Sequence, residues 1–371
     1  MNISEKNMLS LVRSALWGTP AGIQEPIEWS QIIEAASRQT LLGLVASAAG
    51  KLPQEQQPEE AAKTRLQRAL FRIISSHNLL NIRLAEISEI LNNNNIDHVL
   101  LKGEGLAQNY PDPTIRQCGD IDLYIGPNNC LKALRLLIAE SGQEEEEVPL
   151  ENAKHYHIND KGVVVELHKI ADTISGVCAD RLYQQWTLEQ LSGNNLRKVE
   201  IAGTTISLPP YNFDAIYILN HIWHHFIAGG IGLRQVCDWV LYLHKFHKEI
   251  DLRELESDLK SFGMWNVWQI FGELAVRHLG LPENELPLYT GTSRRKADAL
   301  LEVILREGNF GYHAHVKSSP RPKGRIAGKL YTLNANAKRF FYIVSIAPYD
   351  VIRGWISFFI NGILNFFRFN G

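Results

Sequence analysis

The chain has 371 residues, of which 45% are hydrophobic and 21% charged, and its formal net charge is −2 at pH 7. These values exclude a largely disordered, collagen-like or repetitive chain and favour a globular protein of two or three domains. The near-zero net charge also disfavours a general polyanion-binding protein. Nine lysines and arginines but one acid, Asp350, fall between Gly308 and Gly371, so a basic tail follows an acidic body.

The amino-terminal residues and the cysteines bear on the location of the protein. The first residues lack the apolar core of a signal peptide, and no run of about 18 uncharged apolar residues predicts a membrane-spanning helix. The four cysteines have no CxxC spacing, which disfavours a disulfide framework and a cysteine zinc site. We therefore expect a cytoplasmic protein.

The amino-terminal part predicts helices. Residues 1–60 have the pattern of short helices broken by glycine, proline and polar residues. Between residues 66 and 91, apolar residues recur at alternating spacings of four and three, which predicts one long amphipathic helix. Four asparagines, 92–95, end this pattern. His77 lies on the apolar face, so we expect a buried core histidine rather than a metal ligand.

Strands and helices alternate after residue 95. Four strands are predicted, at 97–101, 120–125, 155–159 and 163–168. Asp160-Lys161-Gly162 joins the last two as a hairpin. A short helix is expected after Lys102-Gly103, and a longer one follows Gly126-Pro127-Asn128 as far as about residue 141.

The carboxyl-terminal part predicts helices again. Residues 216–226 and 236–243 form an αα-hairpin through Gly229-Gly230. Further helices are expected at 264–279, 293–306, 336–346 and 351–368. The predicted fold class is α+β, with a small mixed-sheet core embedded between two helical regions. The predicted division is an amino-terminal helical region 1–95, the core 96–210 and a carboxyl-terminal helical region 211–371.

The basic tail has two parts. The loop 317–329 is rich in lysine and arginine and is a candidate contact for RNA or another anionic partner, with a solvated loop as the simpler interpretation. The segment 355–369 is largely apolar with a narrow polar stripe. We expect a buried helix there, and a helix lying on a membrane surface is the alternative.

Acidic residues on the predicted strands are candidates for metal binding. Residues two apart on a strand project from one face, so the carboxylates of Asp120 and Asp122 converge. Oxygen ligands of this kind suit Mg²⁺. Glu166 lies within a β-branched run, where an acid is costly unless it is exposed or has a partner. A solvated strand face or a sheet edge is the alternative for all three residues.

The turn before the acidic strand is a candidate phosphate site. Gly103 would let a phosphate approach the backbone, and Lys102 and the first amides of the following helix would attract an anion. Glu104 is unfavourable beside a triphosphate unless its side chain points away. Arg116 is a candidate to balance developing negative charge, or alternatively pairs with Asp120 or Asp112.

In this order the motifs resemble the bacterial uncharacterised nucleotidyltransferase family, which belongs to the superfamily of DNA polymerase β-like folds. The resemblance covers about residues 65–245 and rests on the segments Leu100-Leu101-Lys102-Gly103, Tyr110-Pro111-Asp112-Pro113, Arg116, Gly119-Asp120-Ile121-Asp122-Leu123, Glu166-Leu167-His168 and His221 to Asp238. It implies that Asp120, Asp122 and Glu166 are catalytic and hold two Mg²⁺ ions. Lys102 and Gly103 would then contact the triphosphate. We also expect His168 and His157 to line the nucleotide pocket as hydrogen-bond donors.

The predicted reaction is Mg²⁺-dependent transfer of a nucleoside monophosphate from a nucleoside triphosphate (NTP) to an acceptor hydroxyl. RNA, protein and small molecules all stay open as the acceptor. The alternative is a catalytically silent nucleotide-binding or scaffold protein that has kept the fold.

Histidines raise a third hypothesis, a zinc hydrolase. His155, His157 and His168 face one another if the strand register agrees, and His221 and His225 share a helix face. The sequence has no HExxH motif, so zinc is the minor interpretation. Arg234 and Asp238 are expected to pair along one helix.

Overall fold

The computed structural model describes residues 1–141, 153–309, 339–341 and 343–352. The protein is α+β, with helices around a four-stranded sheet and a separate two-stranded hairpin. The basic loop 317–329 and the apolar segment 355–369 lie outside the described residues. Among the helices that the structure describes, none is both long and apolar enough to cross a membrane.

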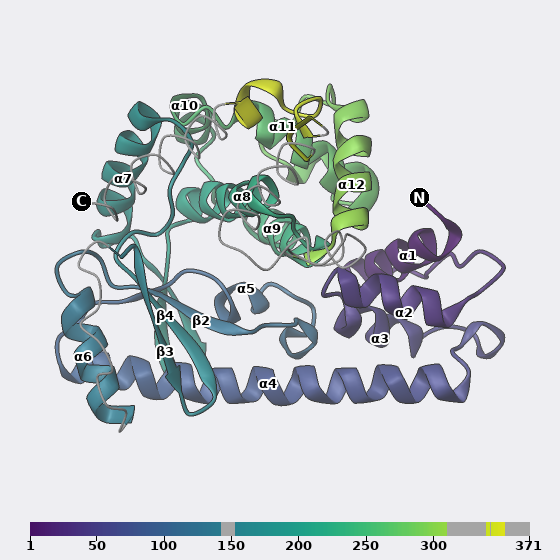
Figure 1. The fold of residues 1–371 in the computed structure, drawn as a ribbon, viewed down its shortest axis with the longest axis horizontal. Coiled ribbons are helices and arrows are strands. Elements are labelled where there is room, and N and C mark those ends of the chain that lie inside the picture. The colour runs from purple at the N-terminus through teal and green to yellow at the C-terminus, as the bar shows by residue number, and fades with distance from the viewer. Residues whose placement is uncertain (142–152, 310–338, 342, 353–371) are drawn as a thin grey trace, which may run out of the picture.

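The amino-terminal helices end in one long helix that crosses the molecule (Figure 1). They are α1 (Ile3–Trp17), α2 (Trp29–Arg38), α3 (Leu42–Ala49) and α4 (Glu60–Asn93). The 34 residues of α4 confirm the helix expected at 66–91. The predicted asparagine stop is also confirmed, because α4 ends at Asn93 and Asn95 has a positive φ of 54°.

The core contains the predicted strands and the helices between them. In chain order these are β1 (Val99–Leu100), α5 (Glu104–Ala107), β2 (Asp120–Tyr124), α6 (Cys130–Ser141), β3 (His155–Asp160) and β4 (Val163–His168). The strand order is β1-β2-β4-β3, with β2 and β4 parallel and the other pairs antiparallel. Lys161 and Gly162 both have positive φ, as the expected tight hairpin turn requires.

The chain then adds a helix and a hairpin that the sequence pattern did not predict, followed by the carboxyl-terminal helices. The additions are α7 (Val177–Leu191), β5 (Arg197–Ile201) and β6 (Thr204–Leu208). The helices are α8 (Tyr211–Ala228), α9 (Leu233–Phe246), α10 (Leu252–Ser261), α11 (Trp265–Leu274) and α12 (Arg294–Glu307). The expected αα-hairpin is therefore confirmed as α8 and α9.

The two faces of the four-stranded sheet differ in chemistry. Ile121, Leu123, Val165 and Leu167 point to one face, where they are buried in a core that also includes residues of α4 and α6. Four polar residues that alternate with them point to the other face, toward a cavity that α8 and α9 also line: Asp120, Asp122, Glu166 and His168. The alternation along each strand thus gives the sheet one apolar face and one face that borders the cavity.

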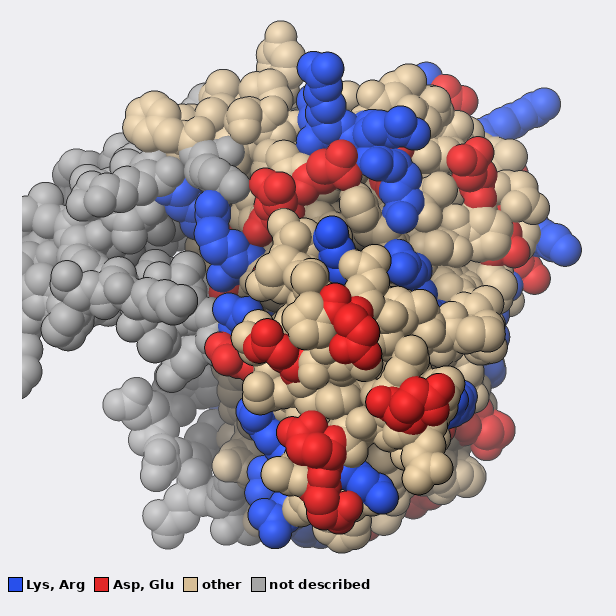
Figure 2. Space-filling view, turned by 90° about the vertical axis from the view of Figure 1, so that its right-hand side faces the viewer, with Lys and Arg blue, Asp and Glu red and all other residues tan. Residues whose placement is uncertain are grey.

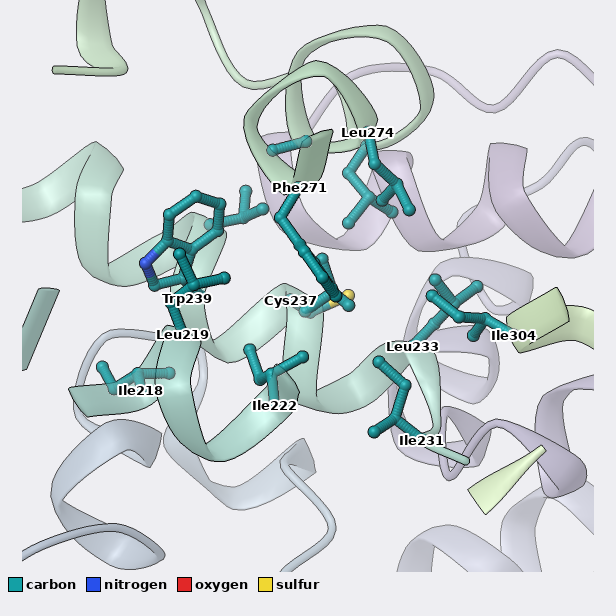
Figure 3. Close-up of a cluster of buried hydrophobic side chains, with 14 of the residues drawn as sticks. Ile218, Leu219, Ile222, Ile231, Leu233, Cys237, Trp239, Phe271, Leu274 and Ile304 are labelled. Carbon is teal, nitrogen blue, oxygen red and sulfur yellow. The ribbon is translucent and has the colours of Figure 1, made fainter. Parts of the chain in front are cut away.

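The helical regions before and after the sheet share one hydrophobic core. Its members include residues of α1 to α3 together with residues of α8, α9, α11 and α12. Figure 3 shows its carboxyl-terminal part, where Trp239 and Phe271 lie among aliphatic side chains. Hydrogen bonds also join the two ends, since Trp17 Nε1 donates to the carbonyl of Leu279 (2.6 Å) and Gln39 Nε2 to that of Ile304 (3.0 Å). Helices α8 and α9, which lie over the polar face of the sheet, are therefore packed in the same core as α1 to α3.

Charges on the face seen in Figure 2 are mixed. Lysine and arginine side chains alternate with acidic ones among the described residues drawn there. That face therefore presents no continuous basic surface of the kind that binds a polyanion.

Candidate active site

Strand register brings two acids together on the polar face of the sheet. Asp122 of β2 lies directly opposite Glu166 of the parallel strand β4. Asp120 is two residues before Asp122, so it points to the same face and lines the same cavity. The three acids that the sequence predicted are thus gathered on one wall, and Glu166 does not lie on an edge strand because β3 continues the sheet beyond it.

Lys102 and His168 compensate the buried carboxylate of Asp122. Its Oδ1 lies 3.0 Å from Nζ of Lys102 and 3.0 Å from Nε2 of His168. Burial raises the pKa of Asp122, but the charge of Lys102 and the hydrogen bond from His168 outweigh burial and hold the pKa well below its usual range. Burial lowers the pKa of Lys102 and the carboxylates of Asp122 and Asp120 raise it, so that the net pKa is raised.

Glu166 and Asp120 differ in their surroundings. Oε1 of Glu166 lies 3.2 Å from His157 Nδ1, and Oε2 lies 3.4 Å from His168 Nε2. The hydrogen bond from His168 lowers the pKa of Glu166 against the opposing effect of burial. For Asp120, burial and the negative charge of Asp122 raise the pKa. The pKa of Asp120 is thus raised while that of Glu166 is lowered. The raised pKa of Asp120 indicates that the positive charge nearby does not compensate all three carboxylates.

One group of described residues has the donors and spacing for a metal ion. Ligand atoms of Asp122, Glu166 and His168 lie within 4.8 Å of one another. Asp120 is not part of this group, although it lines the same cavity. The two carboxylates supply the oxygen ligands that Mg²⁺ prefers, so the donor set fits the expected ion.

Gly103 cannot be replaced by another residue without strain. Its φ is +63°, and a Cβ atom there would lie 3.1 Å from the carbonyl oxygen of Asp120 and 3.3 Å from Sγ of Cys118. The glycine therefore keeps the turn against the start of β2, next to the acids. The following helix, α5, has four residues, so its dipole is weak and Lys102 is the stronger attraction for an anion.

Glu104 points away from the cavity. Its side chain is 1% exposed, and Oε2 lies 2.6 Å from Nδ1 of His77 on α4. His77 in turn lies 2.9 Å from Asn81 through Nε2 and is buried, as the sequence predicted for a core histidine. The acid beside Lys102 and Gly103 is thus paired elsewhere and does not repel an anion at the turn.

Arg116 has an acidic partner that the sequence did not predict. It binds neither Asp120 nor Asp112, the expected partners, because its Nε and Nη2 donate to Asp238 of α9 at 2.8 and 2.9 Å. Burial lowers the pKa of Arg116, but the charge of Asp238 reverses this effect and leaves the pKa well above its usual value. The packing of α9 over the turn, which no local pattern shows, creates this pair.

Asp238 is shared by three donors. Arg234 Nη1 lies 3.3 Å from Oδ2, which confirms the expected pair along α9, and Tyr110 donates to Oδ1 at 2.7 Å. Nη1 of Arg116 is buried without a hydrogen-bond partner in the described structure, and Arg116 and Arg234 both line the cavity. Two guanidinium groups on one carboxylate leave one positive charge in excess at this end of the cavity.

The cavity lies between the polar face of the sheet and helices α8 and α9, and has a volume of about 420 Å³. Its charged lining residues are Lys102, Arg116, Lys154, Arg234, Asp120, Asp122, Glu166, Asp172 and Asp238. Leaving the histidines aside, four basic and five acidic side chains give a formal charge of −1. A triphosphate would therefore need additional cations to enter.

The histidines of the zinc hypothesis lie near one another but do not form a metal cluster. His155 is opposite His168 and His157 is opposite Glu166 in the strand register. In the described part of the chain, however, the metal-type group contains His168 and leaves out His155 and His157. The structure thus brings carboxylates, and not three imidazoles, to one point.

The sequence of the chain matches a known family over residues 25–280, more than half of its length. That family is described as an uncharacterised nucleotidyltransferase. The chain belongs to this nucleotidyltransferase family. No curated protein and no solved structure matches the chain.

The match of this nucleotidyltransferase to its family extends beyond residues 65–245 at both ends. It includes α2, α3 and α11, which pack in the shared helical core. The family match therefore includes both sides of the cavity. One side is the polar face of β2 and β4, the sheet wall, and the other is formed by α8 and α9, the helical wall.

Asp172 is a cavity residue of this nucleotidyltransferase that the sequence analysis missed. It lies just after β4, and His224 Nδ1 donates to its Oδ1 at 2.9 Å. Its Oδ2 lies 3.4 Å from Nδ1 of His221. The spacing of His221 and His224 places both imidazoles near one face of a helix, which could have indicated a shared acidic partner. No local pattern, however, connects either histidine to Asp172.

Proposed function

We propose that the protein transfers a nucleoside monophosphate from an NTP to an acceptor hydroxyl, with Mg²⁺ as cofactor. The observation that carries this proposal is the register of β2 and β4, which sets Asp122 against Glu166 on the wall of a cavity large enough for a nucleotide. Membership of a nucleotidyltransferase family supports the reaction class.

The donor set fits the cofactor. Asp120, Asp122 and Glu166 would hold two Mg²⁺ ions, which when bound supply charge neutralisation and activate the attacking oxygen. The formal charge of −1 in the cavity favours cations. His168 orients both Asp122 and Glu166 by hydrogen bonds from one nitrogen.

The cations of the cavity suit the phosphates of the donor. Lys102, beside Gly103, would exchange its contact with the Asp122 carboxylate for a contact with a phosphate oxygen. At the other end, the unpartnered Nη1 of buried Arg116 would gain an acceptor. An arginine N–H that is buried without a partner costs about 1–3 kcal/mol, so a phosphate oxygen there is favourable. Positioning and charge neutralisation are what this reaction demands of a protein.

Incubation with radiolabelled NTPs tests the proposal. The purified protein is mixed with ATP, GTP, CTP or UTP labelled at the α-phosphate, with Mg²⁺ and a cell extract. We expect a labelled product whose formation stops when the metal is chelated, and the product identifies the acceptor as RNA, protein or a small molecule. We keep the cytoplasm as the proposed location, so cytoplasmic extract is the first choice.

Two variants make this experiment specific. Asp122→Asn removes one charge from the proposed metal site, and Asp112→Asn does the same at an exposed aspartate that caps a nearby turn. Loss of product in the first variant alone supports the proposal. NTP binding by the wild type with no labelled product under any condition would instead favour the catalytically silent alternative.

A further inference from the structure

A second polar pair lies in the cavity on the helical wall. Nδ1 of His221 on α8 lies 3.4 Å from Oδ2 of Asp172, and the side chains are 19% and 10% exposed. The other oxygen, Oδ1, accepts a hydrogen bond from His224. Burial raises the pKa of Asp172, but the contacts with His221 and His224 outweigh burial and lower it. Asp172 is therefore an ionised carboxylate that faces an imidazole.

The other nitrogen of His221 faces the proposed metal site. Nε2 lies 3.3 Å from Nζ of Lys102, which lies 3.0 Å from Oδ1 of Asp122. An ammonium group only donates hydrogen bonds, so Nε2 must be the unprotonated nitrogen and Nδ1 carries the proton toward Asp172. Burial, followed by the charge of Lys102, lowers the pKa of His221. The ring is therefore neutral near pH 7 and able to accept a proton.

The position of Lys102 Nζ marks a point within hydrogen-bond distance of both His221 and Asp122. A hydroxyl oxygen at this point would contact a proton acceptor on one side and the metal-binding acid on the other. In the proposed complex, Lys102 contacts the triphosphate and leaves this point. The excess positive charge of Arg116 and Arg234 lies on α9 and the turn before β2, so the leaving pyrophosphate has its own attraction elsewhere in the cavity.

We propose that His221, oriented by Asp172, is the general base that accepts the proton of the acceptor hydroxyl. This inference rests on the proposed function. The hydroxyl oxygen forms a bond to the α-phosphorus as the bond to the bridging oxygen of the β-phosphate breaks. The electron pair leaves with pyrophosphate, and the proton moves to Nε2 of His221. Asp172 stabilises the resulting imidazolium, which later returns its proton to solvent.

Glu166 is a poorer base in this cavity. Both of its oxygens already face histidines, at 3.2 Å from His157 and 3.4 Å from His168, and its pKa is lowered. Its place opposite Asp122 commits it to the proposed metal ions. A separate base on the helical wall frees the carboxylates for that task.

The first test is independent of activity. In the full-length protein with isotope-labelled histidine, NMR reports which ring nitrogen of His221 carries the proton, and the spectrum of His221→Gln assigns the signal. We expect a neutral ring at pH 7 with the proton on Nδ1. A proton on Nε2, or on both nitrogens, would overturn the inference. Asp172→Asn is expected to populate the other tautomer.

The second test measures catalysis and binding together. Pyrophosphate release from Mg²⁺–NTP is followed with water as the probe acceptor, and binding with the Mg²⁺ complex of α,β-methylene ATP. His221→Gln is expected to slow release about 100-fold or more, the usual scale for a general base, while analogue affinity changes less than about 3-fold. Asp172→Asn should also slow release by about 100-fold or more, because the other tautomer carries its proton on Nε2 and can no longer accept the proton of the hydroxyl.

A control variant and measurements of folding distinguish the loss of a base from a general loss of structure. His244→Gln also removes an imidazole that faces a carboxylate, Glu285 at 2.6 Å, but outside the cavity, and should leave release unchanged. Circular dichroism and thermal unfolding show that each variant is folded. Wild-type release that persists at the same rate in His221→Gln overturns the inference and leaves the proposed function intact. A wild type that binds no analogue overturns the proposed function, and the inference with it.

Discussion

The two walls of the cavity are built in different ways. The sheet wall draws Asp120, Asp122 and Glu166 from two adjacent strands, and backbone register alone sets their spacing. The helical wall draws Arg234, Asp238 and His221 from α8 and α9, and these meet Arg116, Lys102 and Asp172 through tertiary packing.

Because of this difference, we expect substitutions on the sheet wall to affect activity and substitutions on the helical wall to affect stability as well. A substitution on the sheet wall changes charge at the proposed reacting centre without disturbing the apolar face behind it. On the helical wall, the pairs that span the cavity also join the helices to the core, so a substitution there changes stability as well. We therefore expect the two walls to respond differently to substitution.

The largest effect is expected for Asp122→Asn. We expect transfer to fall by about 10³-fold or more, the scale of losing a principal electrostatic group in an active site, with little change in thermal unfolding. Steady-state rates and the melting temperature measure the two effects. A variant that retains full turnover would remove the metal mechanism from the sheet wall.

Arg116→Met tests the helical wall. The bidentate pair with Asp238 is almost fully buried, so we expect the free energy of unfolding to fall by about 3–5 kcal/mol in denaturant titrations. Arg234→Met is the control, because its contact is longer (3.3 Å) and its side chain more exposed, and about 1 kcal/mol or less is expected. Equal losses in the two variants would show that Arg116 does not anchor α9 to the core.

Glu104 and Lys102 make a sharper comparison, since they lie two residues apart and point to different neighbours. Glu104→Gln should lower the free energy of unfolding by about 1–3 kcal/mol through its contact with His77 and leave nucleotide affinity unchanged. Lys102→Gln should weaken binding of the Mg²⁺–α,β-methylene ATP complex. Tighter nucleotide binding by Glu104→Gln would mean that the carboxylate faces the cavity after all.

The smallest effect concerns pH and His224. The hydrogen bond with Asp172 raises the pKa of His224 above its usual value. A raised pKa means that this contribution to stability is complete below about pH 6.5 and is lost as the pH rises through the folded-state pKa. Wild type should thus exceed His224→Gln by more at pH 5.5 than at pH 8.5, by less than about 1 kcal/mol because the side chain is half-exposed. A difference that grows with pH would contradict this assignment.

The sheet wall could be predicted from sequence because its signals are local. Alternation places Asp120 and Asp122 on one face, and the Asp160-Lys161-Gly162 turn fixes the hairpin that carries Glu166. Gly103 and the long helix α4 were predictable for the same reason, since both depend on short-range backbone preferences.

The helical wall could not be predicted in this way. Arg116 and Asp238 are separated by 122 residues, and Lys102 and His221 by 119 residues. No pattern within one element indicates that such side chains meet. The hairpin β5–β6 was missed for a different reason, since the alternation of polar and apolar residues is present in both strands but each strand has only five residues.

The position of the label that reaches the acceptor distinguishes nucleotidyl transfer from transfer of the terminal phosphate. The protein is incubated with Mg²⁺ and cell extract, once with NTP labelled at the α-phosphate and once with NTP labelled at the γ-phosphate. Nucleotidyl transfer predicts an acceptor that carries the α label, with the γ label released in pyrophosphate. An acceptor that carries the γ label, and none of the α label, would contradict the account.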